Sequence, residues 1–194
     1  MQLTFKGRPV LPGNATGVAV VSRGGFNTYA SFFESIHEPS GTAICADSGN
    51  TDLYGRDLAH KIICLPSSTG STSGGAVWQR LIEMGNAPQA MLFSQAIDSM
   101  AAGGLIVADL WAGERIVVVD RLGDAFLEAV VHGDALTIRE DGGVVIRRSG
   151  AEPARAGSRR RGPVPECGPS PLGAATGLTG AGETPKKESQ TGAP

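Results

Sequence analysis

The sequence has few cysteines, and their spacing already excludes several kinds of site. The three, Cys45, Cys64 and Cys167, are far apart and odd in number, which excludes a disulfide framework. None has the close spacing of a zinc or iron–sulfur site, so a metal cluster would take most of its ligands from another chain. Cys64 lies in the apolar run 62–65 and Cys45 in 43–46, so buried structural thiols are expected; a substrate-facing role for Cys45 is the alternative.

The sequence also lacks long hydrophobic runs and a strong charge of either sign. No run of about 18 apolar residues is present, so no membrane span is expected. Residues 1–10 lack the apolar stretch of a signal peptide. The formal net charge of −2 argues against a protein whose main role is to bind nucleic acid. Together these features predict a cytoplasmic protein with neither a membrane nor a nucleic-acid partner.

The composition divides the 194 residues into two parts near Gly150. Residues 1–149 alternate apolar runs with turn signals, which is typical of one folded domain. Residues 150–194 are rich in Gly, Pro and Ala and contain hardly any large apolar side chain. Such a segment cannot bury enough surface to offset its ordering entropy, so we predict a disordered tail, with Arg159 to Arg161 as a solvated basic patch.

Within the folded part, the apolar pattern predicts strands first, then strand–helix units, then a closing hairpin. Residues 23–40 are interpreted as a linking region whose Phe26, Tyr29, Phe32 and Phe33 belong to the core. The middle strands are apolar on both faces, which favours a compact α/β domain with three layers or a barrel-like sheet. The expected strands are 3–10, 17–22, 42–46, 60–65, 89–93 and 115–120; the helices are 76–84, 97–111, with a close-packing point at Gly103 and Gly104, and 124–131, capped by Gly133; the hairpin pairs 135–139 with 144–147.

The chemistry is expected in the Ser/Gly-rich loop 67–74, between a buried strand and a helix. Free N–H groups at a helix start favour an anion, and glycines let a ligand approach the main chain. The same amides could stabilise the alkoxide of a serine acting as a base. The loop lacks the lysine of a P-loop and the G-x-S-x-G pattern, so a helix merely capped by Ser or Thr is an equal alternative at this point.

Other polar residues give weaker signals. His37, His60 and His132 are isolated from any His, Cys or carboxylate cluster, so each is interpreted as a surface or packing residue. Asp98 lies just before Ser99, at the start of the predicted helix 97–111 that follows the predicted strand 89–93. It is expected either to face the same end of the sheet as the loop or to cap the helix.

Five segments in order resemble one known family: 6–10, the glycines Gly13 and Gly17, 62–66, 70–74 and 87–90. They are similar to the aconitase X swivel domain over residues 1 to about 147. The resemblance implies a swivelling β/β/α domain like the mobile last domain of aconitase. It also implies a larger partner subunit that carries the iron–sulfur cluster, with no metal ligand and no cofactor on this chain alone.

The resemblance further implies that Ser71 is the proton acceptor of a hydro-lyase. Gly70 and Thr72 would bind the substrate beside it, with Ser73 and Ser68 as further contacts. Two substrates are associated with the family, of which cis-3-hydroxy-L-proline is the first expectation and mevalonate 5-phosphate the alternative. A non-catalytic regulatory module that binds a small anion is the other reading. The family pattern Ser-Phe-x-Gly-Gly-Val-Asp-Pro is replaced here at 26–33, which leaves the substrate contacts of that segment open.

Overall fold

The computed structural model describes residues 2–37, 40–70 and 73–148. All of them belong to one compact unit, Met1–Glu152. A second unit, Pro153–Pro194, lies outside the described residues, as do Ser149 and Gly150, so the disordered tail stays a prediction. Among the helices of the described part, none has the length and hydropathy needed to cross a membrane.

Eight strands form one curved sheet in the order β1-β8-β7-β3-β4-β5-β6-β2. The central strands β3 to β6 are parallel, whereas the flanking pairs are antiparallel. β1 and β2 stand at opposite ends of this order although only Gly7 separates them, so the sheet curls back on itself as a barrel-like sheet. The strands are β1 (Gln2–Lys6), β2 (Arg8–Leu11), β3 (Ala15–Val21), β4 (Ile62–Leu65), β5 (Ala90–Phe93), β6 (Val117–Asp120), β7 (Ala135–Ile138) and β8 (Gly143–Arg147).

Gly7 explains why the expected strand 3–10 is broken in two. A Cβ at this position would lie 2.4 Å from the carbonyl oxygen of Asp120 and 2.6 Å from a methyl group of Val119, so only glycine fits. Its amide donates to the carbonyl of Gly142 in the hairpin turn at 3.0 Å. The chain therefore leaves β8 and joins β6 at this residue.

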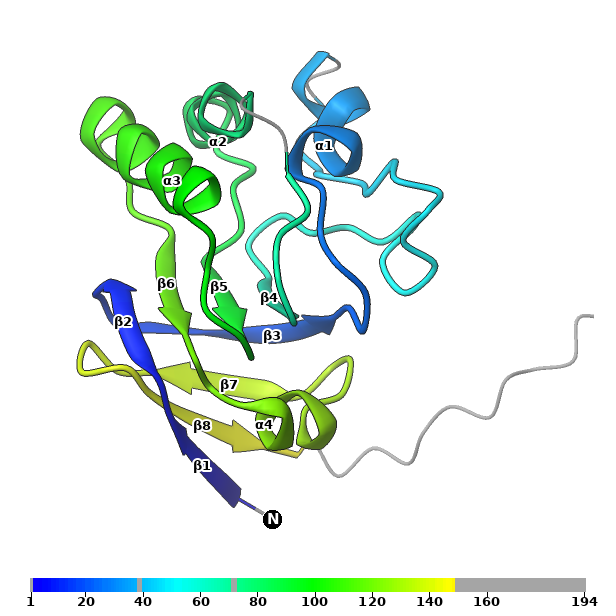
Figure 1. Cartoon of the computed structure of the whole chain (residues 1–194). Helices are drawn as coiled ribbons and strands as arrows, with labels where there is room; N and C mark the ends of the chain where they lie inside the picture. The colour runs from blue at the N-terminus through cyan, green and yellow to red at the C-terminus, as the bar shows by residue number, and fades with distance from the viewer. Residues whose placement is uncertain (1, 38–39, 71–72, 149–194) are drawn as a thin grey trace, which may run out of the picture. The chain divides into compact units, whose positions relative to one another are not determined.

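The helices are α1 (Thr28–His37), α2 (Gly74–Glu83), α3 (Ser99–Ala112) and α4 (Asp124–Ala129). Figure 1 shows α1, α2 and α3 side by side over the parallel strands, while α4 lies with β1, β7 and β8 on the other side. The layers are thus antiparallel strands, parallel strands and helices. This confirms the expected α/β domain of β/β/α type.

Alternation along the parallel strands builds two separate cores. In β4, Ile63 and Leu65 belong to the cluster beneath the helices, whereas Ile62 and Cys64 belong to the cluster inside the curled sheet. β5 and β6 alternate in the same way. Because successive side chains of a strand point to opposite faces, an unbroken apolar run is required where both faces are covered. The expectation of a sheet covered on both sides is confirmed.

Three expectations about local structure are wrong. Residues 42–46 form no strand but a single bridge between Ile44 and Asp57, because their main-chain groups bond to the turn at 55–58 instead of to the sheet. Residues 23–40 are not only a linker, since they contain α1. The helix expected to end with a cap at Gly133 ends at Ala129, with Val130 at the C-cap.

The aromatic residues of this segment divide between core and surface. Phe26 and Phe32 are fully buried and pack on Trp78, with ring centroids 6.4 Å and 5.4 Å from it. Tyr29 and Phe33 lie on the outer face of α1 and are 40% and 47% exposed. The expectation of a common core therefore holds for the first two only.

Both described cysteines are buried structural thiols. Cys45 lies in the core beneath the helices and Cys64 in the core of the curled sheet, exposed by 1% and 0%. Burial raises the pKa of each thiol, so each stays protonated. Cys45 is therefore not a substrate-facing residue.

Candidate functional site

The candidate site is built from the loops that follow the parallel strands at their carboxyl ends. In open α/β sheets ligands bind outside this edge. Here the loops after β3, β4, β5 and β6 are joined by main-chain hydrogen bonds. The amide of Ser22 donates to Cys64, that of Gln95 to Pro66 and that of Arg121 to Gln95, at 2.8, 3.1 and 3.0 Å. The loops therefore form one continuous edge.

The Ser/Gly loop after β4 is held from one side by the loop after β3. Phe26 pairs with Ser68 as a parallel bridge, its amide donates to Ser67 and its carbonyl accepts from Thr69. Gly25 permits this approach, since a Cβ there would lie 2.3 Å from a methyl carbon of Thr69. The segment 26–33 that departs from the family pattern thus begins in direct contact with the Ser/Gly loop.

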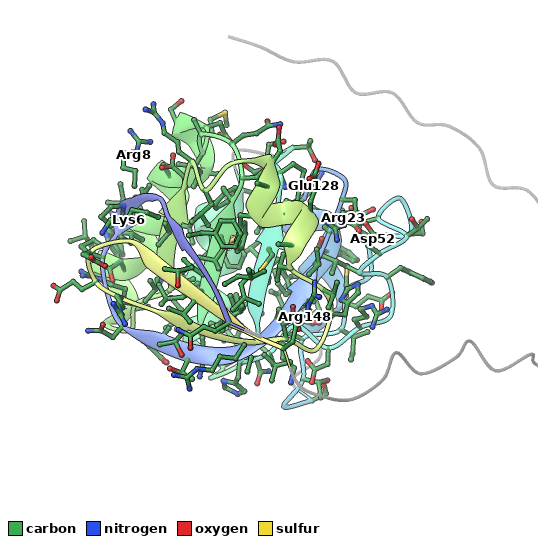
Figure 2. All side chains as sticks on the ribbon, turned by 90° about the horizontal axis from the view of Figure 1, so that it is seen from below. Lys6, Arg8, Arg23, Asp52, Glu128 and Arg148 are labelled. Atoms are coloured by element: carbon green, nitrogen blue, oxygen red, sulfur yellow. The ribbon has the colours of Figure 1, made fainter. Side chains whose placement is uncertain are left out.

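The buried amide of Asn50 fixes the loop after β3. Its Nδ2 donates to Oγ of Ser22 at 2.9 Å and to the carbonyl of Gly25 at 3.3 Å. Beside it, the amide of Arg23 donates to Asp52 at 2.6 Å, and Figure 2 shows these two side chains next to one another. The guanidinium of Arg23 is engaged as well, because it donates to the carbonyls of Leu127 and Val130 at the end of α4. This arginine is therefore a structural residue.

The Ser/Gly loop is held from the other side by Asp98. Its carboxylate accepts from the amides of Met100 and Ala101, both at 2.9 Å, as the N-cap of α3, and from the hydroxyl of Ser68. Partial burial by itself raises the pKa of Asp98, but these hydrogen bonds outweigh it and hold the pKa below its ordinary value. The carboxylate is therefore ionised at neutral pH. Both expected roles of Asp98, a cap and a residue at this edge, are confirmed.

The expected site residues that the structure describes lie in the Ser/Gly loop. Ser68 bonds to Asp98. Gly70 is exposed, with nothing within 4 Å of a Cβ built on it. Ser73 is the N-cap of α2 but forms no side-chain cap hydrogen bond, so a helix capped by this side chain is not observed. Ser71 and Thr72 lie outside the described residues.

Asp120 ties the last parallel strand to the loop after β5. Its side chain is fully buried and accepts from Nε and Nη2 of Arg8, at 2.9 and 2.6 Å, and from the amide of Ile97 at 3.0 Å. Burial by itself raises the pKa of Asp120. The hydrogen bonds from Arg8 and Ile97 and the charges of Arg8 and Arg121 outweigh it and leave the pKa lowered.

We expect Asp120→Asn to lower the free energy of unfolding at pH 7 by about 1–3 kcal/mol, because one charge-assisted hydrogen bond is lost in a buried site. A carboxyl with a lowered folded pKa stabilises above its unfolded pKa of about 3.9 and loses this contribution as the pH falls through the folded pKa. The difference in the free energy of unfolding between the variant and the wild type should therefore become smaller below about pH 4. Urea unfolding across pH checks this. Asp141→Asn is the control that should leave the midpoint unchanged, because it removes the charge of an exposed pair with Lys6 and keeps a side-chain oxygen that can accept from the amide of Gly143.

Arg121 is a residue of this edge that sequence reasoning missed. It directly follows β6 and adopts φ 57°, a left-handed conformation that a long side chain rarely takes. Such strain is concentrated at functional sites. Its side chain is exposed and forms no hydrogen bond or ion pair within the described residues. The signal in the sequence is only its place after an apolar strand.

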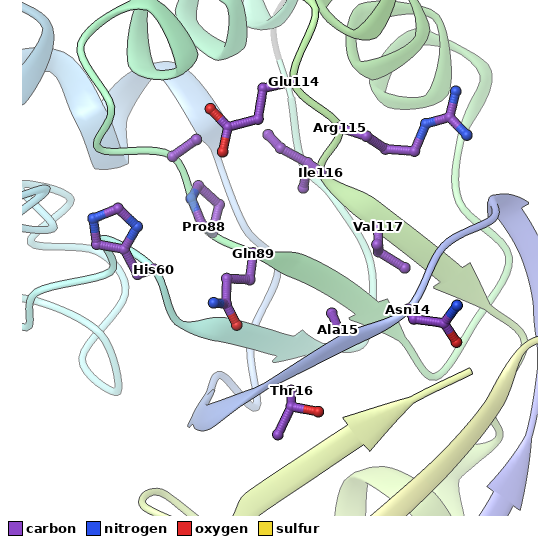
Figure 3. A pocket seen from close by; sticks show the side chains of 11 residues that line it. Asn14, Ala15, Thr16, His60, Pro88, Gln89, Glu114, Arg115, Ile116 and Val117 are labelled. Carbon is purple, nitrogen blue, oxygen red and sulfur yellow. The ribbon is translucent and has the colours of Figure 1, made fainter. Parts of the chain in front are cut away.

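A polar hollow also lies at the opposite edge, where the parallel strands begin. Figure 3 shows His60, Gln89 and Glu114 around it. It measures about 290 Å³. His60 is another left-handed residue, with φ 57°. The hollow is separated from the Ser/Gly loop by the length of the strands.

Within the residues that the structure describes, no group of three His, Cys, Asp or Glu side chains could hold a metal ion. His37 bonds to the carbonyl of Phe33, and Nδ1 of His132 accepts from the amide of Val21 at 3.2 Å. His37 is thus an exposed surface residue and His132 a residue that packs on β3, both as expected.

The fold and this edge define a class of α/β domain in which a Ser/Gly loop at the open carboxyl end of the parallel strands leads into a helix. The family model of the aconitase X swivel domain matches residues 4–146, which is most of the chain. The chain belongs to this family.

Relatives with known activities are similar to nearly the whole folded part. The phosphomevalonate dehydratase small subunit of Methanocella arvoryzae is 31% identical over 143 residues, which are 74% of this chain and 98% of that protein. The cis-3-hydroxy-L-proline dehydratase of Hypocrea jecorina is 30% identical over 115 residues, which are 59% of this chain but only 18% of that protein. The crystal structure of holo aconitase X from Thermococcus kodakaraensis covers 75% of this chain and 99% of its own, with a TM-score of 0.62 and 26% identity. Like the relatives from Methanocella arvoryzae and Hypocrea jecorina, the chain is part of a dehydratase.

Proposed function

We propose that this chain is the small subunit of a hydro-lyase that dehydrates a small hydroxy acid, and that Ser71 accepts the proton. The observation that supports this most is the place of the Ser/Gly loop, which lies on the open carboxyl edge of the sheet and leads into α2. The helix start offers amides with a positive dipole end, and the open space at Gly70 leaves room for a ligand.

In the proposed reaction Ser71, as the alkoxide, takes a proton from a substrate carbon while the neighbouring C–OH bond breaks. The electrons of the C–H bond form the C=C bond, and the hydroxide leaves as water after taking up a proton. A serine hydroxyl is a weak base at neutral pH, so the loop amides must stabilise its alkoxide. The described residues offer no metal site, so we place the iron–sulfur cluster that the family resemblance implies on a large partner subunit.

The charges at the edge favour cis-3-hydroxy-L-proline as the substrate. Arg8 and Arg23 are engaged in internal bonds, which leaves Arg121 to meet one carboxylate. Asp98 already accepts three hydrogen bonds, so it would act through its negative charge, which attracts the ammonium group of an amino acid and repels a phosphate. The product is an enamine that tautomerises to a pyrroline carboxylate. Mevalonate 5-phosphate is the second candidate, because the relative from Methanocella arvoryzae, which the match covers almost completely, is a phosphomevalonate dehydratase small subunit.

The direct test is a dehydration assay of this chain purified with its large subunit under anaerobic conditions. Each chain is also assayed alone, with cis-3-hydroxy-L-proline and with mevalonate 5-phosphate. Turnover that requires both chains supports the proposal, and the substrate that is consumed decides between the two. Turnover of the phosphate alone would overturn the assignment of Asp98 to an ammonium group.

Asp98→Asn separates the charge of Asp98 from its role as a cap. Asparagine is as good an N-cap as aspartate, so the melting temperature should stay within a few degrees. The KM for cis-3-hydroxy-L-proline should rise about tenfold, which corresponds to about 1.4 kcal/mol for one charged contact. Steady-state kinetics of the complex check this. An unchanged KM would remove Asp98 from the substrate site.

Arg121→Gly tests the proposed carboxylate contact without a backbone penalty, since glycine adopts φ 57° freely. The KM should rise at least tenfold because a charged hydrogen bond is lost. Stability should be retained, because the strain of the left-handed residue is relieved. His60→Gly is a matched control, as it removes a left-handed side chain at the opposite edge and should leave the KM unchanged. Equal KM values for the two variants would contradict the contact.

A further inference from the structure

The helix α3 has an apolar surface that the fold of this chain does not use. Only Leu105 and Ala108 of its residues are buried. Met100, Ile106, Val107, Leu110 and Trp111 are exposed, and we call these five residues the α3 patch. Leu110 and Trp111 are 73% and 75% exposed. A helix that is apolar all round is normally buried on every side, and an apolar patch of this kind marks an interaction site.

The α3 patch borders a groove between α2 and α3. The groove measures about 520 Å³ and is lined by Gly75, Ala76 and Gln79 of α2 and, on α3, by Gly103, Val107 and other residues that include Met100 and Trp111. Gly103 has no side chain to fill the bottom of the groove, and nothing lies within 4 Å of a Cβ built on it. The only charged residue of α3 is Asp109, which Arg115 neutralises through two hydrogen bonds of 2.8 and 2.7 Å. The surface therefore suits an apolar side chain of a partner.

The α3 patch is continuous with the candidate site. The groove begins at Gly75 and Ala76, just after the Ser/Gly loop, and at Ser99 and Met100, just after Asp98. A chain that covers the open edge must therefore also lie over the start of both helices. We propose that the α3 patch is the docking surface for the large subunit, an inference that rests on the proposed function.

Two other occupants fit less well. Residues 149–194 contain Val164, Leu172 and Leu178 as their only large apolar side chains, too few to cover five exposed ones. A second copy of this chain could pair its own α3 patch with this one, but it has no surface that would cover the open carboxyl edge of the sheet. In the dehydratase of Hypocrea jecorina the matched region is 18% of a much longer chain. This is expected if the domain functions in contact with a larger protein.

The test uses the full chain, the large subunit and the double variant Leu110→Gln with Trp111→Gln. The affinity is measured by titration calorimetry, and circular dichroism of each small chain alone checks its folding. We expect the Kd to rise at least tenfold while the melting temperature stays the same, because both side chains are exposed. Val18→Thr, an exposed change on β3, is the control and should leave the Kd unchanged.

The outcomes separate this inference from the proposed function. If the wild type binds the large subunit and the double variant binds equally well, the docking surface is wrong and the proposed function stands. If the wild type does not bind it at all, both are overturned. Dimers of the wild type alone that the double variant abolishes would assign the patch to a second copy instead. Hydrogen exchange of the wild-type complex is a second measurement, in which the amides of 99–112 should gain protection on binding.

Discussion

Ser71→Ala should abolish turnover by the complex while the two subunits still assemble. Loss of a general base costs about 10²–10⁴-fold in rate, and here the same oxygen must be stabilised as an alkoxide, so we expect kcat to fall at least 10³-fold. Because the change removes one oxygen from a loop whose described neighbours are exposed, the melting temperature and the Kd for the large subunit should not change. Single-turnover kinetics and calorimetry measure the two effects separately.

Ser67→Ala is the matched control for Ser71→Ala, since it removes a hydroxyl from the same loop. Ser67 contributes to the edge through its carbonyl, which accepts from Phe26 at 3.1 Å and is unaffected by the change. Activity should stay within a few-fold of the wild type. Full activity of Ser71→Ala would remove this residue as the proton acceptor. An equal loss in both variants would indicate that the loop as a whole, and not one oxygen, was disturbed.

The strand–loop–helix unit around the site could be predicted from the sequence because every signal in it is local. The apolar run 62–65 has no polar residue, so it had to be a strand covered on both faces, and the spacing of Val77, Leu81 and Met84 required a helix with one buried face. The structure has β4 and α2 at these places. When the spacing of apolar residues and the burial of a segment indicate the same element, the residue types alone are enough to predict that strand or helix.

The helix α1 could not be predicted because its sequence has little helical preference. Thr28, Tyr29, Ser31 and Phe32 are weak helix formers, and no polar–apolar pattern stands out. The helix is stabilised by tertiary contacts, above all the packing of Phe32 on Trp78 of α2 at 5.4 Å. Tertiary packing of this kind routinely overrides propensity.

The site could be predicted only as far as its loop. The bond between Ser68 and Asp98 joins residues thirty positions apart, and the edge that brings Arg121 near Gln95 exists only in the folded sheet. The left-handed backbone of Arg121 is also set by the chain around it, not by its residue type. Residue patterns therefore indicated the candidate loop, whereas the charged residues around that loop depend on strand order.

Gly104→Ala and Gly103→Ala should change stability in opposite directions, although the two residues are neighbours in α3. A Cβ on Gly104 would lie 2.9 Å from the amide nitrogen of Gly75 in α2, so the helices cannot keep their crossing. A Cβ on Gly103 meets nothing within 4 Å. We expect a loss of about 1–3 kcal/mol for Gly104→Ala and a gain of about 0.5–1 kcal/mol for Gly103→Ala, since alanine favours a helix over glycine.

Thermal melting of the isolated chain measures this difference, which should amount to about 5–15 °C between the two variants. Equal melting temperatures would show that the helices adjust at no cost and that Gly104 is not the close-packing point. Because Gly75 lies at the start of α2, the Gly104 variant should also displace the helix end that follows the Ser/Gly loop. Its kcat in the complex should then fall, while that of Gly103→Ala stays near the wild-type value when the large subunit is saturating, since Gly103 lines the proposed docking groove but not the Ser/Gly loop. One steric contact would thus connect the packing of two helices to the geometry of the site.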